Sequence, residues 1–124
     1  SFEQDPTFGL TLLAETAQRA LSPGVNDPGT AYEVMGRITR LLWENLPEDT
    51  SATKAEADYP HVHLPPVTAK DLLKVSFPPI ALYAEDAPEV MTWMETSLKA
   101  LEHHSNTAMT EAAREMRRSY FDAQ

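Results

Sequence analysis

The chain has 124 residues, of which 42% are hydrophobic, a length and composition that suit one folded domain with its own core. Asp and Glu outnumber Lys and Arg by 19 to 10, and the resulting net charge of −9 argues against nucleic acid or an anionic lipid surface as a partner. The lack of cysteine excludes disulfides and thiolate chemistry, and no stretch reaches the ~20 apolar residues that span a bilayer.

Apolar residues at helical spacing predict two helices in the first part of the chain. The first runs over about residues 7–22, and the second runs over about residues 28–46. Between them, Gly24 favours a helix end, and Asp27 followed by Pro28 is typical of a cap and first turn. The residues that define the two apolar stripes are Leu10, Leu13, Ala17 and Leu21, then Ala31, Val34, Met35, Ile38, Leu41, Leu42 and Leu46, with Trp43 broadening the second.

The middle of the chain lacks a helical period. Residues 47–57 are polar and predict a mobile loop. Residues 58–66 alternate in polarity, which allows a short edge strand or hairpin, although three prolines keep this segment out of a sheet interior.

The last part of the chain predicts three more helices. The third begins at Thr68, with an acid three residues later, and is broken by Pro78-Pro79. The fourth begins at Asp86, paired with Glu89 as a capping-box variant, and the fifth restarts at residues 105–106.

Every clear period is therefore helical. We predict an all-α fold, an irregular bundle of about five helices in a single soluble domain over residues 1–124. Methionines in the last two helices are interpreted as adaptable core rather than as cofactor contacts.

Two segments carry a family resemblance: Phe2-Glu3-Gln4-Asp5-Pro6-Thr7-Phe8-Gly9-Leu10, and the run from Ala20 to Ala31 that contains Ser22-Pro23-Gly24-Val25-Asn26-Asp27-Pro28-Gly29-Thr30. Together they resemble the signature of the bacterial predicted membrane proteins grouped as domain-of-unknown-function family 2254. The resemblance implies a larger protein of the bacterial inner membrane with transmembrane helices upstream and this segment as its soluble C-terminal part. We expect this part to lie in the cytoplasm. It implies no reaction.

The link between the first two helices is the most unusual polar feature. Its candidate ligand-binding or interface residues are Ser22, Asn26, Asp27 and Thr30, together with the N-terminal Glu3, Gln4 and Asp5. Gathered acidic oxygens would suit Ca²⁺ or Mg²⁺. The alternative, which we favour, is that these residues are caps and turns.

The first helix separates these two groups by about 24 Å at 1.5 Å per residue. They can therefore meet only if the N-terminal segment folds back or if a second copy supplies one of them. This obstacle predicts a homo-oligomer in which the N-terminal segment of one copy meets the link of another.

Histidines give a weaker metal hypothesis. His61 and His63 share a face if their segment is extended, but two ligands do not complete a site. No full catalytic set, phosphate loop or cofactor motif is present in the sequence.

The leading functional hypothesis is thus a non-catalytic assembly or regulatory domain of a membrane protein, reaching the membrane through segments outside this chain. The alternatives are a small-ligand or divalent-metal sensor that uses the Asn26-Asp27 link, and a small hydrolase that uses His61 or His63.

Overall fold

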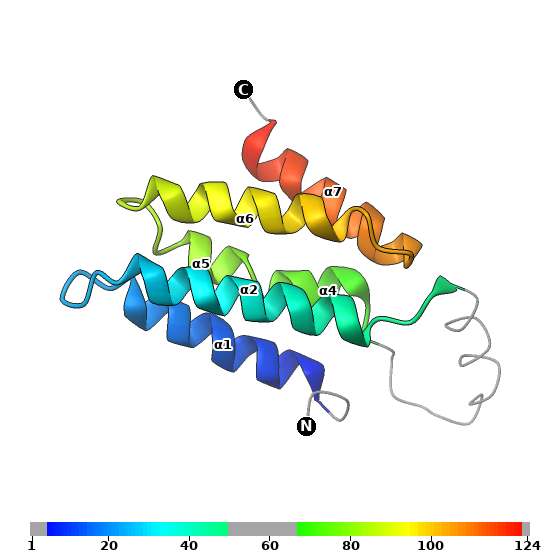
Figure 1. Ribbon diagram of the computed structural model, residues 1–124, viewed down its shortest axis with the longest axis horizontal. Helices are drawn as coiled ribbons and strands as arrows, with labels where there is room; N and C mark the ends of the chain where they lie inside the picture. Colours follow the sequence, from blue (N-terminus) through cyan, green and yellow to red (C-terminus); the bar gives the residue numbers. More distant parts are fainter. Residues whose placement is uncertain (1–4, 50–66, 123–124) are drawn as a thin grey trace.

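The computed structural model describes residues 5–49 and 67–122, and within these ranges all regular structure is helical. The helices are α1 (Pro6–Ala20), α2 (Pro28–Asn45), α4 (Ala69–Lys74), α5 (Pro78–Ala81), α6 (Pro88–Leu101) and α7 (Thr107–Phe121) (Figure 1). The predicted all-α fold is confirmed.

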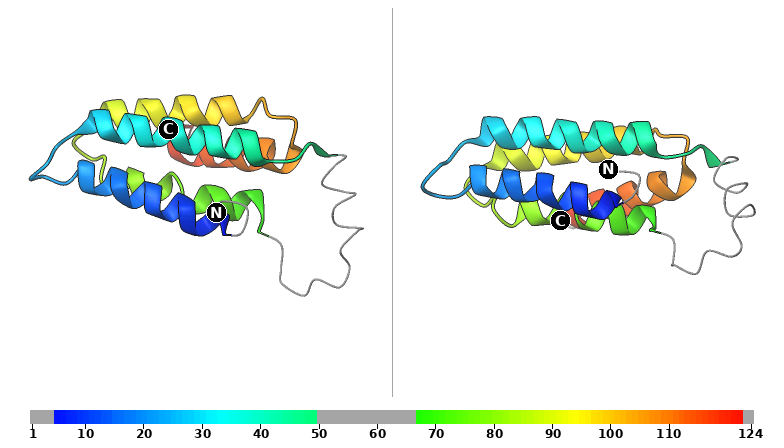
Figure 2. Two further views of the ribbon diagram at one scale, coloured as in Figure 1. Left: turned by 60° about the horizontal axis from the view of Figure 1, so that its bottom comes forward. Right: turned by 90° about the horizontal axis from the view of Figure 1, so that it is seen from below.

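The helices form a closed ring around one core. α1 packs on α2, α2 on α6, α6 on α7 and α7 on α4, while α4 and α5 both return to α1. Figure 2 shows α2 beside α6 in one layer and α1 beside α4 and α5 in the other. Since α4 and α5 are the two halves of the predicted third helix, the ring has the five expected segments.

Side-chain caps explain where four helices begin. Asp5, Asp27, Thr68 and Asn106 each accept a hydrogen bond from the backbone N–H three residues later. Such bonds satisfy donors that have no partner within the helix. The starts predicted at Asp27, at Thr68 and at residues 105–106 are confirmed.

The predicted start of the fourth helix at Asp86 is wrong. Pro88 occupies the first position of α6, so the capping position falls on Ala87, which makes no side-chain cap. Proline favours this first helical position because its fixed φ suits the helix and it has no N–H to satisfy. Asp86 therefore lies one residue too early to cap the helix.

The two prolines break the third helix where expected. α4 ends at Lys74, and α5 restarts at Pro78, with Phe77 fully buried between them. The Ser76 hydroxyl, also buried, donates to the Leu72 carbonyl at 2.7 Å. Gln18 Nε2 donates to the Pro79 carbonyl at 2.9 Å and so ties α1 to this break.

Buried apolar side chains confirm most of the predicted stripes. Met94 and Met109 have no exposed surface, as their interpretation as core requires. Trp43 is an exception, because it is 43% exposed rather than part of the core. The largest fully buried side chains include Leu10, Met35, Ile38, Leu42, Leu73, Phe77, Ile80, Leu98 and Leu101.

Residues 47–49 are attached to the bundle. The Pro47 carbonyl accepts a hydrogen bond from Asn106 Nδ2 at 2.9 Å. The Asp49 carboxylate accepts the backbone N–H of Thr107 at 2.7 Å and also the Thr107 hydroxyl. The rest of the predicted loop over 47–57, and the edge strand or hairpin predicted over 58–66, lie outside the described residues.

Candidate functional site

The link between α1 and α2 is held by hydrogen bonds within itself and to the last carbonyls of α1. Asp27 N–H donates to the Ala20 carbonyl, and Ser22 Oγ donates to the Arg19 carbonyl at 2.7 Å. Asn26 has a φ of 49°, a left-handed conformation that asparagine tolerates better than most residues. The link thus reverses the chain through local turn chemistry.

Asp27 uses both carboxylate oxygens as a cap. Oδ1 accepts the Thr30 N–H at 3.2 Å, and Oδ2 accepts the Thr30 hydroxyl at 2.6 Å. These bonds, the one from the hydroxyl above all, lower the pKa of Asp27 below its usual value of 3.8. The arrangement agrees with the favoured interpretation of this residue as a cap.

Asp5, the described candidate of the N-terminal segment, is not brought to the link within one chain. Asp5 caps α1 at its other end, through Phe8 N–H at 3.1 Å and the Thr7 hydroxyl at 3.0 Å. At 1.5 Å per residue, α1 separates Asp5 from the link by about 22 Å. Glu3 and Gln4 lie outside the described residues, so a site shared between copies stays a prediction.

The histidine hypothesis finds no support in the part of the chain that the structure describes. His61 and His63 lie outside it, and it holds no group of three or more His, Asp or Glu side chains that could bind a metal ion. His104 joins two elements instead. Its Nε2 lies 2.9 Å from the Trp43 carbonyl, and its Nδ1 accepts the Asn106 N–H at 2.9 Å.

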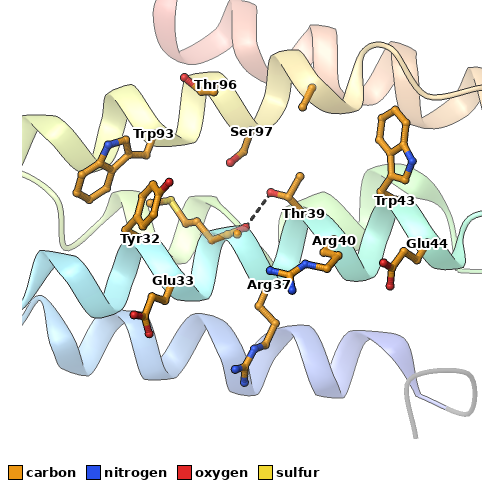
Figure 3. A pocket seen from close by; sticks show the side chains of 13 residues that line it. Tyr32, Glu33, Arg37, Thr39, Arg40, Trp43, Glu44, Trp93, Thr96 and Ser97 are labelled. Atoms are coloured by element: carbon orange, nitrogen blue, oxygen red, sulfur yellow. Dashed lines mark hydrogen bonds between the residues drawn. The ribbon is translucent and has the colours of Figure 1, made fainter.

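The feature that the sequence did not predict is a groove of about 740 Å³ between α2 and α6, here called the α2–α6 groove. Its volume lies in the range of known small-molecule sites. Two stripes with the same spacing line it. They are Tyr32, Gly36, Thr39 and Trp43 on α2, and Trp93, Ser97 and Ala100 on α6 (Figure 3).

Aromatic rings mark both ends of the α2–α6 groove. Tyr32 and Trp93 meet edge to face at one end, with centroids 4.8 Å apart. At the other end, Trp43 meets His104 edge to face at 4.7 Å. Both tryptophans of the chain therefore line this one surface, since the sequence holds only two.

The middle of the groove has small side chains. Gly36, Ser97 and Ala100 leave the space between the aromatic ends open. The hydroxyl of Thr39 donates to the Met35 carbonyl of its own helix at 2.8 Å (dashed in Figure 3), so its hydrogen bond is made without a ligand. This surface suits an apolar occupant more than a polar one.

A row of charged side chains runs along α2 at the edge of the groove. Glu33, Arg37, Arg40 and Glu44 are spaced four, three and four residues apart, which places them on one side of the helix. We call this row the charged rim. Among the described residues, neither arginine of the rim makes an ion pair.

Three arginines lie close together in the sequence near the C-terminus, Arg114, Arg117 and Arg118, and two of them have a structural role. Arg117 donates two hydrogen bonds to the Glu102 carboxylate, one of them at 3.1 Å, and Arg114 lies 3.8 Å from it. The hydrogen bonds from Arg117 lower the pKa of Glu102. These contacts join α6 to α7, whereas the arginines of the charged rim join nothing in the described part of the fold.

These features define a helical-bundle domain with an open groove between α2 and α6. The chain belongs to the family of predicted membrane proteins DUF2254, whose model matches residues 1–100. No helix within the described residues is long and apolar enough to cross a membrane.

The curated relatives are themselves uncharacterised. The chain is 37% identical over 59 residues to the uncharacterized protein Rv1290c of Mycobacterium tuberculosis and to Mb1321c of Mycobacterium bovis. Each match covers 44% of this chain and 11% of the relative, so the chain spans a small part of their length. No solved structure matches.

Proposed function

We propose that this chain is a non-catalytic docking module of a membrane protein, and that the α2–α6 groove is where another protein segment binds. The observation that carries the proposal is that Trp43, Trp93 and Tyr32 line an open groove whose middle has only small side chains. Binding in this groove would serve assembly or regulation of the complete protein.

The residue types support docking. Tryptophan, tyrosine and arginine dominate the binding energy of protein interfaces, because they bury large areas and still offer a polar group. All three types line this groove, with Tyr32 56% exposed and Trp43 43% exposed. Aromatic rings that face water do not stabilise an isolated helical bundle, and a contiguous exposed apolar surface is typical of an interaction site.

Site-specific photo-crosslinking in the complete protein, kept in its membrane, tests the proposal. Ala100 is exposed and lines the groove, so a benzophenone side chain at this position reaches any occupant. Glu111, exposed on α7 away from the groove, is the control position. We expect a protein crosslink from position 100. Crosslinks to lipid alone, or none beyond those from position 111, contradict a docking role.

Self-association through α1 is a second proposal with its own support. Phe8 and Leu12 are 60% and 46% exposed one turn apart on α1, and Val25 in the link is 60% exposed. Antiparallel packing of α1 on the α1 of a second copy would cover them and would set the Asp5 end of each copy beside the link of the other.

Light scattering at high micromolar concentration tests this second proposal. We expect a dimer that the variant Leu12→Glu dissociates. A monomer across the whole concentration range contradicts it.

The sensor alternative remains a prediction with a direct test. In calorimetry of the chain with Ca²⁺, Mg²⁺, Mn²⁺ and Zn²⁺, we expect a heat of binding if the Asn26-Asp27 link or the histidines bind metal. If none of the four ions gives a heat of binding, metal sensing is refuted. The hydrolase alternative through His61 or His63 and the cytoplasmic placement also stay predictions.

A further inference from the structure

We infer that the occupant of the α2–α6 groove is an amphipathic helix from a partner segment, with two acidic residues facing Arg37 and Arg40. This inference rests on the proposed docking function and adds the chemistry of the partner. It follows from the length of the groove, its aromatic ends and the order of charges on its rim.

The length of the groove and the spacing of its lining residues suit a bound helix. α2 and α6 run parallel, because Tyr32 pairs with Trp93 at one end and Trp43 pairs with His104 at the other. The stripe from Tyr32 to Trp43 extends over about 16 Å at 1.5 Å per residue, which corresponds to three turns of a helix. An amphipathic helix places its apolar residues at this same spacing.

The two arginines at the centre of the rim select acidic residues in the facing part of the partner. The chain carries a net charge of −9, yet the centre of the rim presents Arg37 and Arg40 one turn apart. Neither forms an ion pair in the described ranges, unlike Arg114 and Arg117, which share Glu102. Because the net charge of the chain repels acidic segments, these two neighbouring arginines favour acidic residues of a partner at the centre of the rim.

The order of charges also argues against a second copy of α2 in the groove. Along the helix, the rim is negative at Glu33, positive at Arg37 and Arg40, and negative at Glu44. This order is the same in both directions. Two copies in full register, parallel or antiparallel, would therefore set like charges opposite each other.

If the two copies are displaced by one turn, two Arg–Glu pairs form between them. One arginine of each copy is still left without a partner. A partner with the complementary order, basic–acidic–acidic–basic, satisfies all four positions. Its central acids would be three residues apart, matching Arg37 and Arg40, and its bases would lie four residues further out on each side.

Two blocked helical peptides serve as probes. Each has about 16 residues, so that it is partly helical on its own. Both carry leucines on one face, and the first has Lys, Glu, Glu and Lys along the flank at the spacing of the rim. The second peptide has Glu, Lys, Lys and Glu at the same four positions. Binding is measured by fluorescence anisotropy of labelled peptide and by the emission of Trp43 and Trp93.

We expect the first peptide to bind at least about tenfold more tightly than its inverted twin, a difference of about 1.4 kcal/mol. The double variant Arg37→Glu, Arg40→Glu should reverse this preference. The control Arg118→Glu, an exposed arginine on α7 outside the groove, should leave it unchanged. Circular dichroism of each variant checks that the fold is kept.

Equal binding of the two peptides, tighter binding of the inverted peptide, or binding by neither overturns the inference. So does a dimer that the double variant dissociates, because the occupant is then a second copy. The crosslink from position 100 separates the two proposals. If it forms to a neutral or basic segment, only the acidic partner is refuted; if no protein crosslink forms, the docking function itself fails.

Discussion

At the scale of single residues, Asp27 shows how one carboxylate sets the boundary of a helix. Its oxygens hold the N–H and the hydroxyl of Thr30, and its charge faces the positive end of the α2 dipole. We therefore expect stability to fall in the order wild type, Asp27→Asn, Asp27→Ala. Asparagine keeps an acceptor for the N–H and loses the charge, while alanine loses both.

Urea denaturation at neutral pH measures this order as shifts of the unfolding midpoint with an unchanged slope. Gly24→Ala in the same link is a matched control, because a Cβ at this position meets no atom within 4 Å and it caps nothing. An Asp27→Ala variant as stable as wild type would show that the cap is not what stabilises the start of α2.

At the scale of elements, the boundaries and apolar faces of the helices could be predicted because they depend on neighbouring residues. Asp27 before Pro28 and Thr68 with its capping box mark helix starts within four residues of sequence. The prediction that Asp86 caps α6 was wrong because the same sequence pattern allows the helix to begin at two positions. The proline at position 88 selects the later of the two.

The α2–α6 groove could not be predicted in the same way. It depends on α2 and α6 lying parallel, and they are separated by more than forty residues of chain. Tyr32, Gly36, Thr39 and Trp43 recur at helical spacing, but the sequence pattern assigned Trp43 to the core stripe of α2. Only the packing shows that this face is left open rather than buried.

Gly36 gives a test of this open face. It lies inside α2, and a Cβ added to it meets no atom within 4 Å. Gly36→Ala should therefore stabilise the fold by about 0.5–1 kcal/mol through higher helix propensity. Gly9→Ala in α1 also has free space and is the control outside the groove.

The larger variant Gly36→Phe should fold and yet abolish binding of the probe peptide that carries Lys, Glu, Glu and Lys, because its ring fills the groove. Thermal melts and the anisotropy assay measure the two effects. Destabilisation by Gly36→Ala would contradict the open space described here.

At the scale of the whole molecule, three carboxylates that accept hydrogen bonds in the folded state share one electrostatic property. Their hydrogen bonds lower the pKa of Asp27 through Thr30, of Asp49 through Thr107 and of Glu102 through Arg117. A lowered pKa in the folded state means that the unfolded chain binds protons more readily. Their contribution is complete above the usual values of 3.8 and 4.5 and is lost as the pH falls through the lowered ones.

We therefore expect these groups to make the free energy of unfolding nearly independent of pH near neutrality and to lower it below about pH 4. Urea midpoints measured across this range test the expectation. In Glu102→Gln the drop should be shallower, because one of the three titrating groups is gone. Stability that rises on acidification would mean that these carboxylates do not stabilise the fold.

Hydroxyl-radical footprinting of Trp43 and Trp93 is the most direct test of the central claim that the α2–α6 groove is occupied in the complete protein. The chain alone and the complete protein in its membrane are compared by mass spectrometry, with the exposed Tyr83, outside the groove, as the reference. We predict that both indoles react readily in the chain alone and are protected in the complete protein, while Tyr83 is unchanged. Equal reactivity of the two tryptophans in both samples would contradict the account.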